Sequence, residues 1–122
     1  MSQAIKDFER TGTAGENLAS AQYYIVQLSA TGNIEVAEGA TDLIVGVLQN
    51  KPASGEAALY RFAGTTKVVA SAAIAIGAFV TTTATGKAVT TTTAGDHVVG
   101  RALEAAAADG DIIEIQLMQF RY

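Results

Sequence analysis

The sequence predicts an all-β protein: a small pseudo-symmetric β-barrel or sandwich of two repeated β motifs, with an extended N-terminal arm. Three observations favour this fold. Short apolar runs rich in β-branched residues recur about every ten residues, glycine-containing turns separate them, and one block of the chain is repeated. The 122 residues have the length of one domain.

The apolar runs set the expected strands. These are residues 23–28, 34–37, 43–49, 57–62, 66–70, 79–83, 88–92, 98–103 and 112–118. Two alanine-rich segments, residues 70–76 and 101–108, compete as helices. Because Gly77 and Asp109-Gly110 end them early, we expect at most one helical turn in each.

The first residues of the chain lack this strand pattern. Residues 1–18 show neither a period of 2 nor one of 3.6, and they mix charged residues with glycine. Such a stretch is ordered only when something holds it. The sequence therefore predicts an N-terminal arm, residues 1–18, followed by a β-barrel domain, residues 19–122.

An internal repeat predicts the two motifs. Residues 26–49 and 80–103 align without a gap at an offset of 54, and both copies contain Ala-Thr-Gly and, later, Val-Gly. With one inserted residue the match continues through residues 55–56 and 110–111. The hairpin glycine supplies the positive φ of a tight turn, and the Val-Gly glycine suits a bulge or a close approach of two backbones. The alternative is chance similarity of biased composition, which the shared offset of two unlike pieces disfavours.

Composition excludes several functions. Eight Lys and Arg against 12 Asp and Glu give a formal charge of −4, which disfavours nucleic acid as a partner. With no cysteine and one histidine, the chain has neither a thiolate site nor a His-rich metal centre. Because 24 residues are alanine, the core is expected to be thin and subunit contacts are expected to support it. Threonine and glycine interrupt the uncharged stretch between Lys67 and Lys87, so we expect a soluble protein without a membrane partner.

No catalytic, cofactor-binding or metal-binding residues emerge. His97 follows Asp96, but no nucleophile-elbow pattern accompanies the pair, and the repeat has Leu43 at the position of His97. The acidic residues are scattered over turns, and the sequence neither shows nor excludes a facing pair. Asp109-Gly110-Asp111 lacks the remaining ligands of a calcium loop, so we expect a plain turn.

Lys87 raises one alternative function. It follows the Ala-Thr-Gly hairpin, where small pseudo-symmetric biotin or lipoate carrier domains present their modified lysine. The carrier lysine is flanked by Met-Lys-Met or Asp-Lys-Ala, whereas the neighbours here are glycine and alanine. A solvated turn lysine is therefore favoured, and the carrier domain stays an alternative.

Four blocks in order carry a resemblance to a known family. They are Ile44-Val45-Gly46-Val47, residues 72–81 (AAIAIGAFVT), Gly86-Lys87-Ala88-Val89 and residues 98–111 (VVGRALEAAAADGD). Across residues 43–117 the chain resembles the small capsid cement, or head decoration, proteins of tailed bacteriophages. Residues 58–63 (ALYRFA) depart from the pattern, because they lack the proline and lysine of many relatives, and residues 1–18 match no part of it.

The resemblance implies a non-enzymatic homotrimer without cofactors on the outer capsid surface of the virion. Synthesised in the host bacterial cytoplasm, the trimer would sit at three-fold positions of the expanded head and bridge neighbouring major capsid protein subunits. Neither nucleic acid nor a membrane is an expected partner. Another phage structural protein, of the tail or of head–tail assembly, is the competing identity.

The N-terminal arm is the candidate contact segment. We hypothesise that residues 2–15, with Phe8 as their only aromatic residue, lie along the capsid or along an adjacent decoration subunit. The candidate partner-binding residues are Ile5, Phe8 and Arg10.

Overall fold

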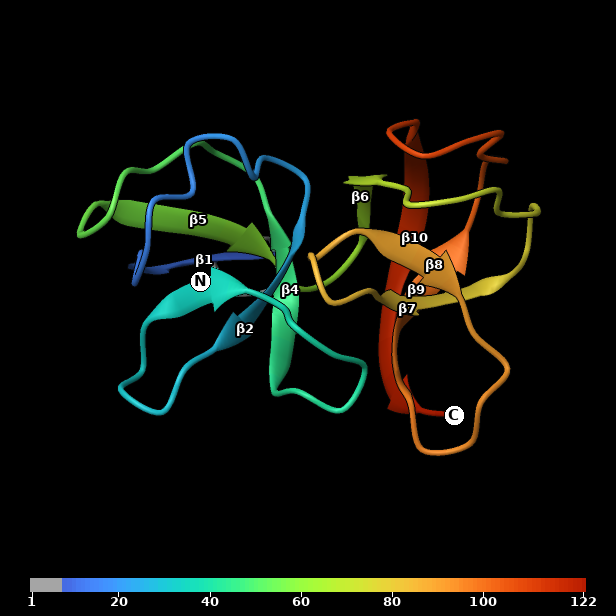
Figure 1. Ribbon diagram of the computed structural model, residues 1–122, viewed down its shortest axis with the longest axis horizontal. Coiled ribbons are helices and arrows are strands. Elements are labelled where there is room, and N and C mark those ends of the chain that lie inside the picture. The colour runs from blue at the N-terminus through green and yellow to red at the C-terminus, as the bar shows by residue number, and fades with distance from the viewer. Residues whose placement is uncertain (1–7) are drawn as a thin grey trace, which may run out of the picture.

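A computed structural model describes residues 8–122, and it places them in strands and connecting turns (Figure 1). Two five-stranded antiparallel sheets form two lobes side by side, a sandwich-like arrangement that confirms the expected all-β class. The strand pairings of the described residues close no barrel. Neither residues 70–76 nor residues 101–108 form a helix, and no helix of membrane-spanning length and apolarity occurs in residues 8–122.

The two sheets have the same strand order. The first contains β1 (Glu9–Thr13), β2 (Ile25–Leu28), β3 (Ile34–Val36), β4 (Ile44–Leu48) and β5 (Ala57–Arg61), in the order β1-β5-β4-β2-β3. The second contains β6 (Thr65–Val69), β7 (Phe79–Thr82), β8 (Ala88–Thr90), β9 (His97–Ala102) and β10 (Ile112–Arg121), in the order β6-β10-β9-β7-β8. We call β1–β5 the first half and β6–β10 the second half. The predicted repeat is thereby confirmed, and it extends over both sheets.

Strand register follows the sequence alignment. Val26 lies opposite Gly46 in the first half, and Val80 lies opposite Gly100 in the second, so the offset of 54 is kept. Counterparts of β5 in β10 lie 55 residues later, as the single inserted residue requires, and those of β1 in β6 lie 56 residues later. Most paired strand residues of one half therefore have a counterpart at a known position of the other, whereas Phe120 and Arg121 at the end of β10 have none.

The glycine of each Val-Gly pair allows two backbones to approach closely. A Cβ atom added to Gly46 would overlap the carbonyl oxygen of Arg61, and one added to Gly100 would overlap that of Gln116. This confirms the predicted close approach in both halves. The hairpin glycines Gly32 and Gly86 have φ values of 83° and 81°, also as predicted.

Strand β1 was not expected from the sequence. It lies at an edge of the first sheet, paired along its length with β5, and the chain after it is buried at Ala14 and Leu18. The segment Glu-Arg-Thr-Gly-Thr carries no apolar alternation, so its sequence pattern does not predict a strand. The strand is stabilised by main-chain pairing with β5. Residues 1–7 lie outside the described residues, and the division of the chain at residue 18 stays a prediction.

The core consists of two clusters of buried aliphatic side chains. The first half buries its own set: Ala14, Leu18, Ala21, Val26, Ile34, Leu48 and Ala58. The counterparts of nearly all of these belong to a larger cluster in the second half, which also takes in Ile25, Ala37, Ile44 and Val47 from the first half. The two halves therefore share one hydrophobic core at their joint.

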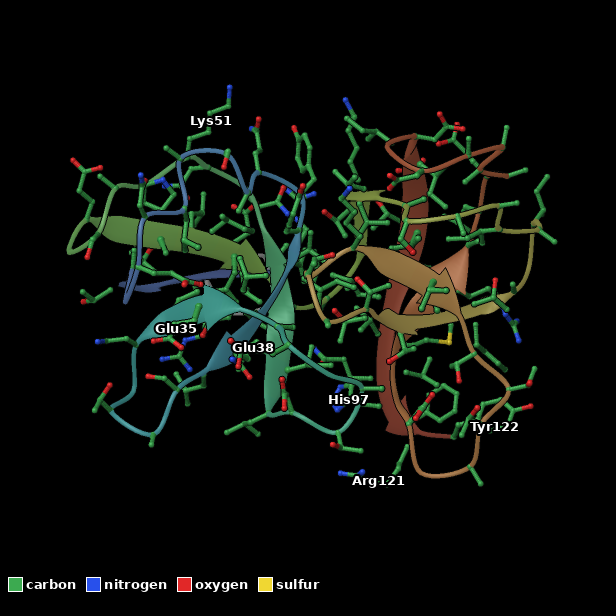
Figure 2. The ribbon with its side chains drawn as sticks, in the orientation of Figure 1. Glu35, Glu38, Lys51, His97, Arg121 and Tyr122 are labelled. Atoms are coloured by element: carbon green, nitrogen blue, oxygen red, sulfur yellow. The ribbon has the colours of Figure 1, made fainter. Side chains whose placement is uncertain are left out.

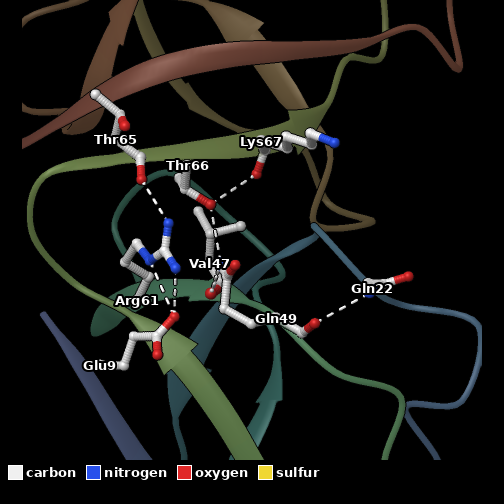
Figure 3. A network of polar contacts seen from close by, with 8 residues as sticks. All are labelled: Glu9, Gln22, Val47, Gln49, Arg61, Thr65, Thr66 and Lys67. Atoms are coloured by element: carbon white, nitrogen blue, oxygen red, sulfur yellow. Dashed lines mark hydrogen bonds and ion pairs between the residues drawn. The ribbon is translucent and has the colours of Figure 1, made fainter.

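Polar side chains connect the halves at one side of this joint (Figure 3). The Arg61 guanidinium on β5 donates hydrogen bonds to the Glu9 carboxylate and, at 2.9 Å, to the Thr65 carbonyl. Gln49 Nε2 donates to Thr66 Oγ1 at 2.8 Å. These contacts fix where the chain passes from the first sheet to the second.

Candidate functional site

His97 is part of the joint between the halves (Figure 2). Its amide donates to the carbonyl of Ala40, and its Nε2 lies 3.0 Å from Oε1 of the Gln119 side chain. An amide side chain does not exchange protons near neutral pH, so this pair cannot relay a proton to a nucleophile. The geometry therefore gives His97 a packing role.

The turn acids are occupied by local contacts. Asp111 Oδ2 accepts hydrogen bonds from the amides of Ala107 and Ala108, which closes the turn as a side-chain cap. Asp109 Oδ1 lies 3.1 Å from Lys87 Nζ. The expected plain turn is confirmed at these residues. Among residues 8–122 no group of three or more His, Cys, Asp or Glu side chains is placed to hold a metal ion.

Lys87 is held as a cation. Its hydrogen bond to Asp109, together with the attraction of that carboxylate, raises the pKa of Lys87 above its usual value. A lysine that accepts a biotinyl or lipoyl group must react as the free amine, which a raised pKa makes scarcer. The environment of Lys87 therefore works against the carrier alternative.

We expect the intact mass of the chain, produced in bacteria with active biotin and lipoate ligases, to equal that of the unmodified sequence. The reasons are the Gly-Lys-Ala context, which differs from that of a carrier lysine, and the ion pair of Lys87 with Asp109. A mass increase equal to one attached group, absent from the Lys87→Arg variant, would contradict this prediction and restore the carrier alternative.

A shallow hollow of about 440 Å³ lies beside the joint, and Tyr23 and Lys67 line it together with charged side chains. Tyr23 has a φ of 68°, a conformation that costs a non-glycine residue about 1 kcal/mol, whereas its counterpart is Gly77 with a φ of 85°. The Tyr23 carbonyl accepts a hydrogen bond from Val69, and Lys67 Nζ lies 5.9 Å from the ring centroid. Tyr23 is therefore occupied in joining the halves, and the hollow lies open to solvent.

One partly exposed surface lies on the first half. Arg10 on β1 is directly opposite Tyr60 on β5, and the Phe62 amide donates to the Phe8 carbonyl at 2.9 Å. Residues that are opposite each other or two apart share one face of a sheet, so these four side chains form one surface. Phe8 is 47% exposed, Arg10 is exposed, and Tyr60 and Phe62 are half-buried. We call this surface the β1–β5 face.

A second surface lies on the second half. The rings of Phe120 and Tyr122 meet Phe79 edge to face, with centroids 5.2 and 6.3 Å apart, and the Arg101 guanidinium lies 4.6 Å from the Phe79 centroid. Phe120 and Tyr122 are 41% and 44% exposed. We call this cluster the β7–β9 face. Figure 2 shows Tyr122 in the lower part of the second lobe.

Both faces have the composition of protein-binding surfaces. Tyr, Phe and Arg side chains dominate at the centres of protein–protein interfaces and supply most of their binding energy. Of the predicted site residues, Phe8 and Arg10 lie together on the β1–β5 face, and Ile5 lies outside the described residues. The pattern along the chain did not indicate Tyr60, Phe62 or the β7–β9 face. For Tyr60, Phe62, Phe79 and Arg101 the repeat carried the relevant signal, because the counterparts of these four residues lie in the joint.

The family model for phage cement proteins matches residues 8–117. The chain is a member of the phage cement protein family. This confirms the resemblance found in the sequence and extends it to β1, which the sequence pattern alone had not aligned. The cement protein is thus a structural protein of a bacteriophage virion.

A solved structure shares the fold. It is the base of the head fibre protein gp8.5 of bacteriophage phi29, 22% identical, with a TM-score of 0.71 over 93% of this chain and 96% of that one. At this identity the likeness shows the fold alone. No curated protein matches the sequence.

Proposed function

We propose that this cement protein binds the outer surface of the expanded phage head as a homotrimer and bridges neighbouring major capsid protein subunits, without catalysing a reaction. The family match over residues 8–117 carries the proposal. Two partly exposed faces rich in Tyr, Phe and Arg support the homotrimer, because a ring of identical chains uses two different surfaces of each chain. A trimer also gains from multivalency, since three weak contacts act together.

Sedimentation tests the proposal directly. Purified protein is mixed with expanded and with unexpanded heads that lack it, and the heads are pelleted. We expect the protein to pellet with expanded heads only, at a stoichiometry of three chains per three-fold position. Equal binding to both forms, or electron microscopy that places the protein on the tail, would contradict it and favour a tail or head–tail assembly protein.

The arm gives a second test of the same proposal. Because β1 is part of the first sheet, we restrict the deletion to residues 2–7, which include Ile5. We expect the shortened protein to keep its thermal midpoint and to lose most of its retention on heads at low concentration. The matched control replaces Ile5 alone with serine, for which we expect a smaller loss. Unchanged retention of both proteins would show that the arm makes no capsid contact.

A further inference from the structure

The two halves of the chain pack head to tail. In their shared cluster the second half contributes the part of its sheet around Ile115 and Leu117, whereas the first half contributes Ile25, Ile44 and Val47 from β2 and β4. A two-fold arrangement would use counterpart residues from both halves. Here the two halves contribute different surfaces, so the contact is heterologous.

Main-chain hydrogen bonds follow the same pattern. They run from Ile25 N–H to the Gly86 carbonyl at 2.7 Å, from Val69 N–H to the Tyr23 carbonyl at 3.0 Å, and from His97 N–H to the Ala40 carbonyl at 2.7 Å. None of these pairs is repeated with the halves exchanged within the described residues. The contact therefore leaves one copy of each surface unused within the chain.

The unused copies coincide with the two exposed faces. On the β1–β5 face, the residues Phe8, Arg10, Tyr60 and Phe62 are the counterparts of Gly64, Thr66, Ile115 and Leu117, which lie at the joint. At the β7–β9 face, Phe79, Arg101 and the buried Val98 beside them are the counterparts of Ile25, Val47 and Ile44. Apart from Phe120 and Tyr122, which have no counterparts in the first half, the residues of each face thus correspond to one side of an interface that the chain already forms.

Main-chain groups at these faces also lack partners. The counterparts of the His97 amide and the Ala40 carbonyl are the amide of Leu43 and the carbonyl of Ala94. Both residues are exposed, and neither group takes part in a hydrogen bond within residues 8–122. Leu43 is 62% exposed, which is unusual for a large apolar side chain.

We propose that a second copy of this chain docks its β7–β9 face onto the β1–β5 face of the first, repeating between chains the interface that joins the halves within one chain. Heterologous contacts form a closed ring when the rotation between units closes. The number of chains in this ring rests on the homotrimer of the proposed function. Three chains would form a closed ring of six similar halves. In this ring Phe8 and Arg10 contact the neighbouring subunit, one of the two partners anticipated for the arm.

The residue differences between the two interfaces fit this role. Ile115 and Val47, which never leave the core of one chain, are replaced by Tyr60 and Arg101 at the faces between chains. A face that is exposed before assembly must be compatible with water, and Tyr and Arg combine solubility with strong contacts once buried. Phe120 and Tyr122, at the end of the chain, enlarge the β7–β9 face.

Engineered disulfides test the proposed contact, because the natural chain has no cysteine. The variant Leu43→Cys with Ala94→Cys places thiols at the predicted contact between chains. The control, Ala40→Cys with His97→Cys, places them at the counterpart position within one chain, where the main-chain bond is 2.7 Å. After oxidation at micromolar concentration, we expect the first variant to form covalent dimers and trimers and the control to stay monomeric on a denaturing, non-reducing gel.

Three further outcomes contradict the inference or the homotrimer on which it rests. Monomers alone from the Leu43→Cys, Ala94→Cys variant, with a native mass still trimeric, would mean that the trimer uses another contact, and the proposed function would stand. A ladder beyond three chains would mean that the contact does not close. A chain that is monomeric both in solution and on expanded heads would contradict the proposed homotrimer itself.

A substitution provides a measurement independent of disulfide geometry. We expect Phe62→Asp to weaken assembly by on the order of tenfold or more in native mass spectrometry, because it buries a charge at the predicted contact. Ile112→Asp is the matched control, since Ile112 is 54% exposed on β10 and lies on neither face. Equal effects of the two substitutions on assembly would contradict the proposal.

Discussion

Replacing Gly100 with alanine is expected to lower the free energy of unfolding by about 3 kcal/mol, a large loss for a single added methyl group. The new Cβ would overlap the main-chain carbonyl oxygen of Gln116, and main-chain atoms of a paired strand cannot move aside without breaking the β9–β10 ladder. Gly46→Ala is expected to behave similarly, because its Cβ would overlap the Arg61 carbonyl.

Thermal unfolding measures this loss. A decrease of about 3 kcal/mol corresponds to a fall of roughly 12 °C in the melting temperature of a domain of this size. Gly39→Ala serves as the control, because its Cβ would meet nothing closer than 3.9 Å. A Gly100→Ala protein as stable as Gly39→Ala would mean that the two strands do not approach as closely as described.

Exchanging a core pair between the halves is expected to cost much less stability than the sum of its two single substitutions. The first half has Gly12 beside Ile34, where an added Cβ on Gly12 would lie 2.7 Å from Ile34 Cγ1. The second half has Val68 and Ala88 at the counterpart positions, both fully buried. In the first half the larger side chain of this pair is Ile34 on β3, and the other residue is a glycine. In the second half the larger side chain is Val68 on β6, and the other residue is an alanine.

A double-mutant cycle quantifies this compensation. We expect Gly12→Val to cost about 2 kcal/mol by overpacking, and Ile34→Ala about 3 kcal/mol by leaving a cavity. Because the valine fills that cavity, the double variant should cost only about 2 kcal/mol, a coupling of about 3 kcal/mol. Chemical denaturation of the four proteins provides the values, and additive costs would refute the compensation.

Much of the fold was predictable because it is written in local patterns. Each expected strand between residues 23 and 118 is present, since period-2 apolar runs and turn glycines act within a few residues. The Ala-Thr-Gly and Val-Gly repeats also identified the glycines that a turn or a close approach requires. The resemblance in four of these blocks indicated the family before any tertiary information was used.

The exposed faces were harder to predict. Phe8 and Arg10 were selected as contact residues of an arm, yet they lie beside Tyr60 and Phe62 because β1 pairs with β5, about fifty residues later. Nothing in the local pattern of Glu9–Thr13 records that pairing. The β7–β9 face likewise depends on Phe120 and Tyr122 folding back onto Phe79.

The sequence by itself determined the strands, the turns and the duplication, because hydrophobic periodicity and glycine conformation act over short distances. Only the tertiary structure decided which copy of each duplicated surface is buried. The two halves carry nearly the same pattern, and their head-to-tail contact covers Ile25 and Ile115 while it leaves Phe79 and Tyr60 partly exposed. That choice depends on how one sheet is oriented against the other, which no single segment of the chain encodes.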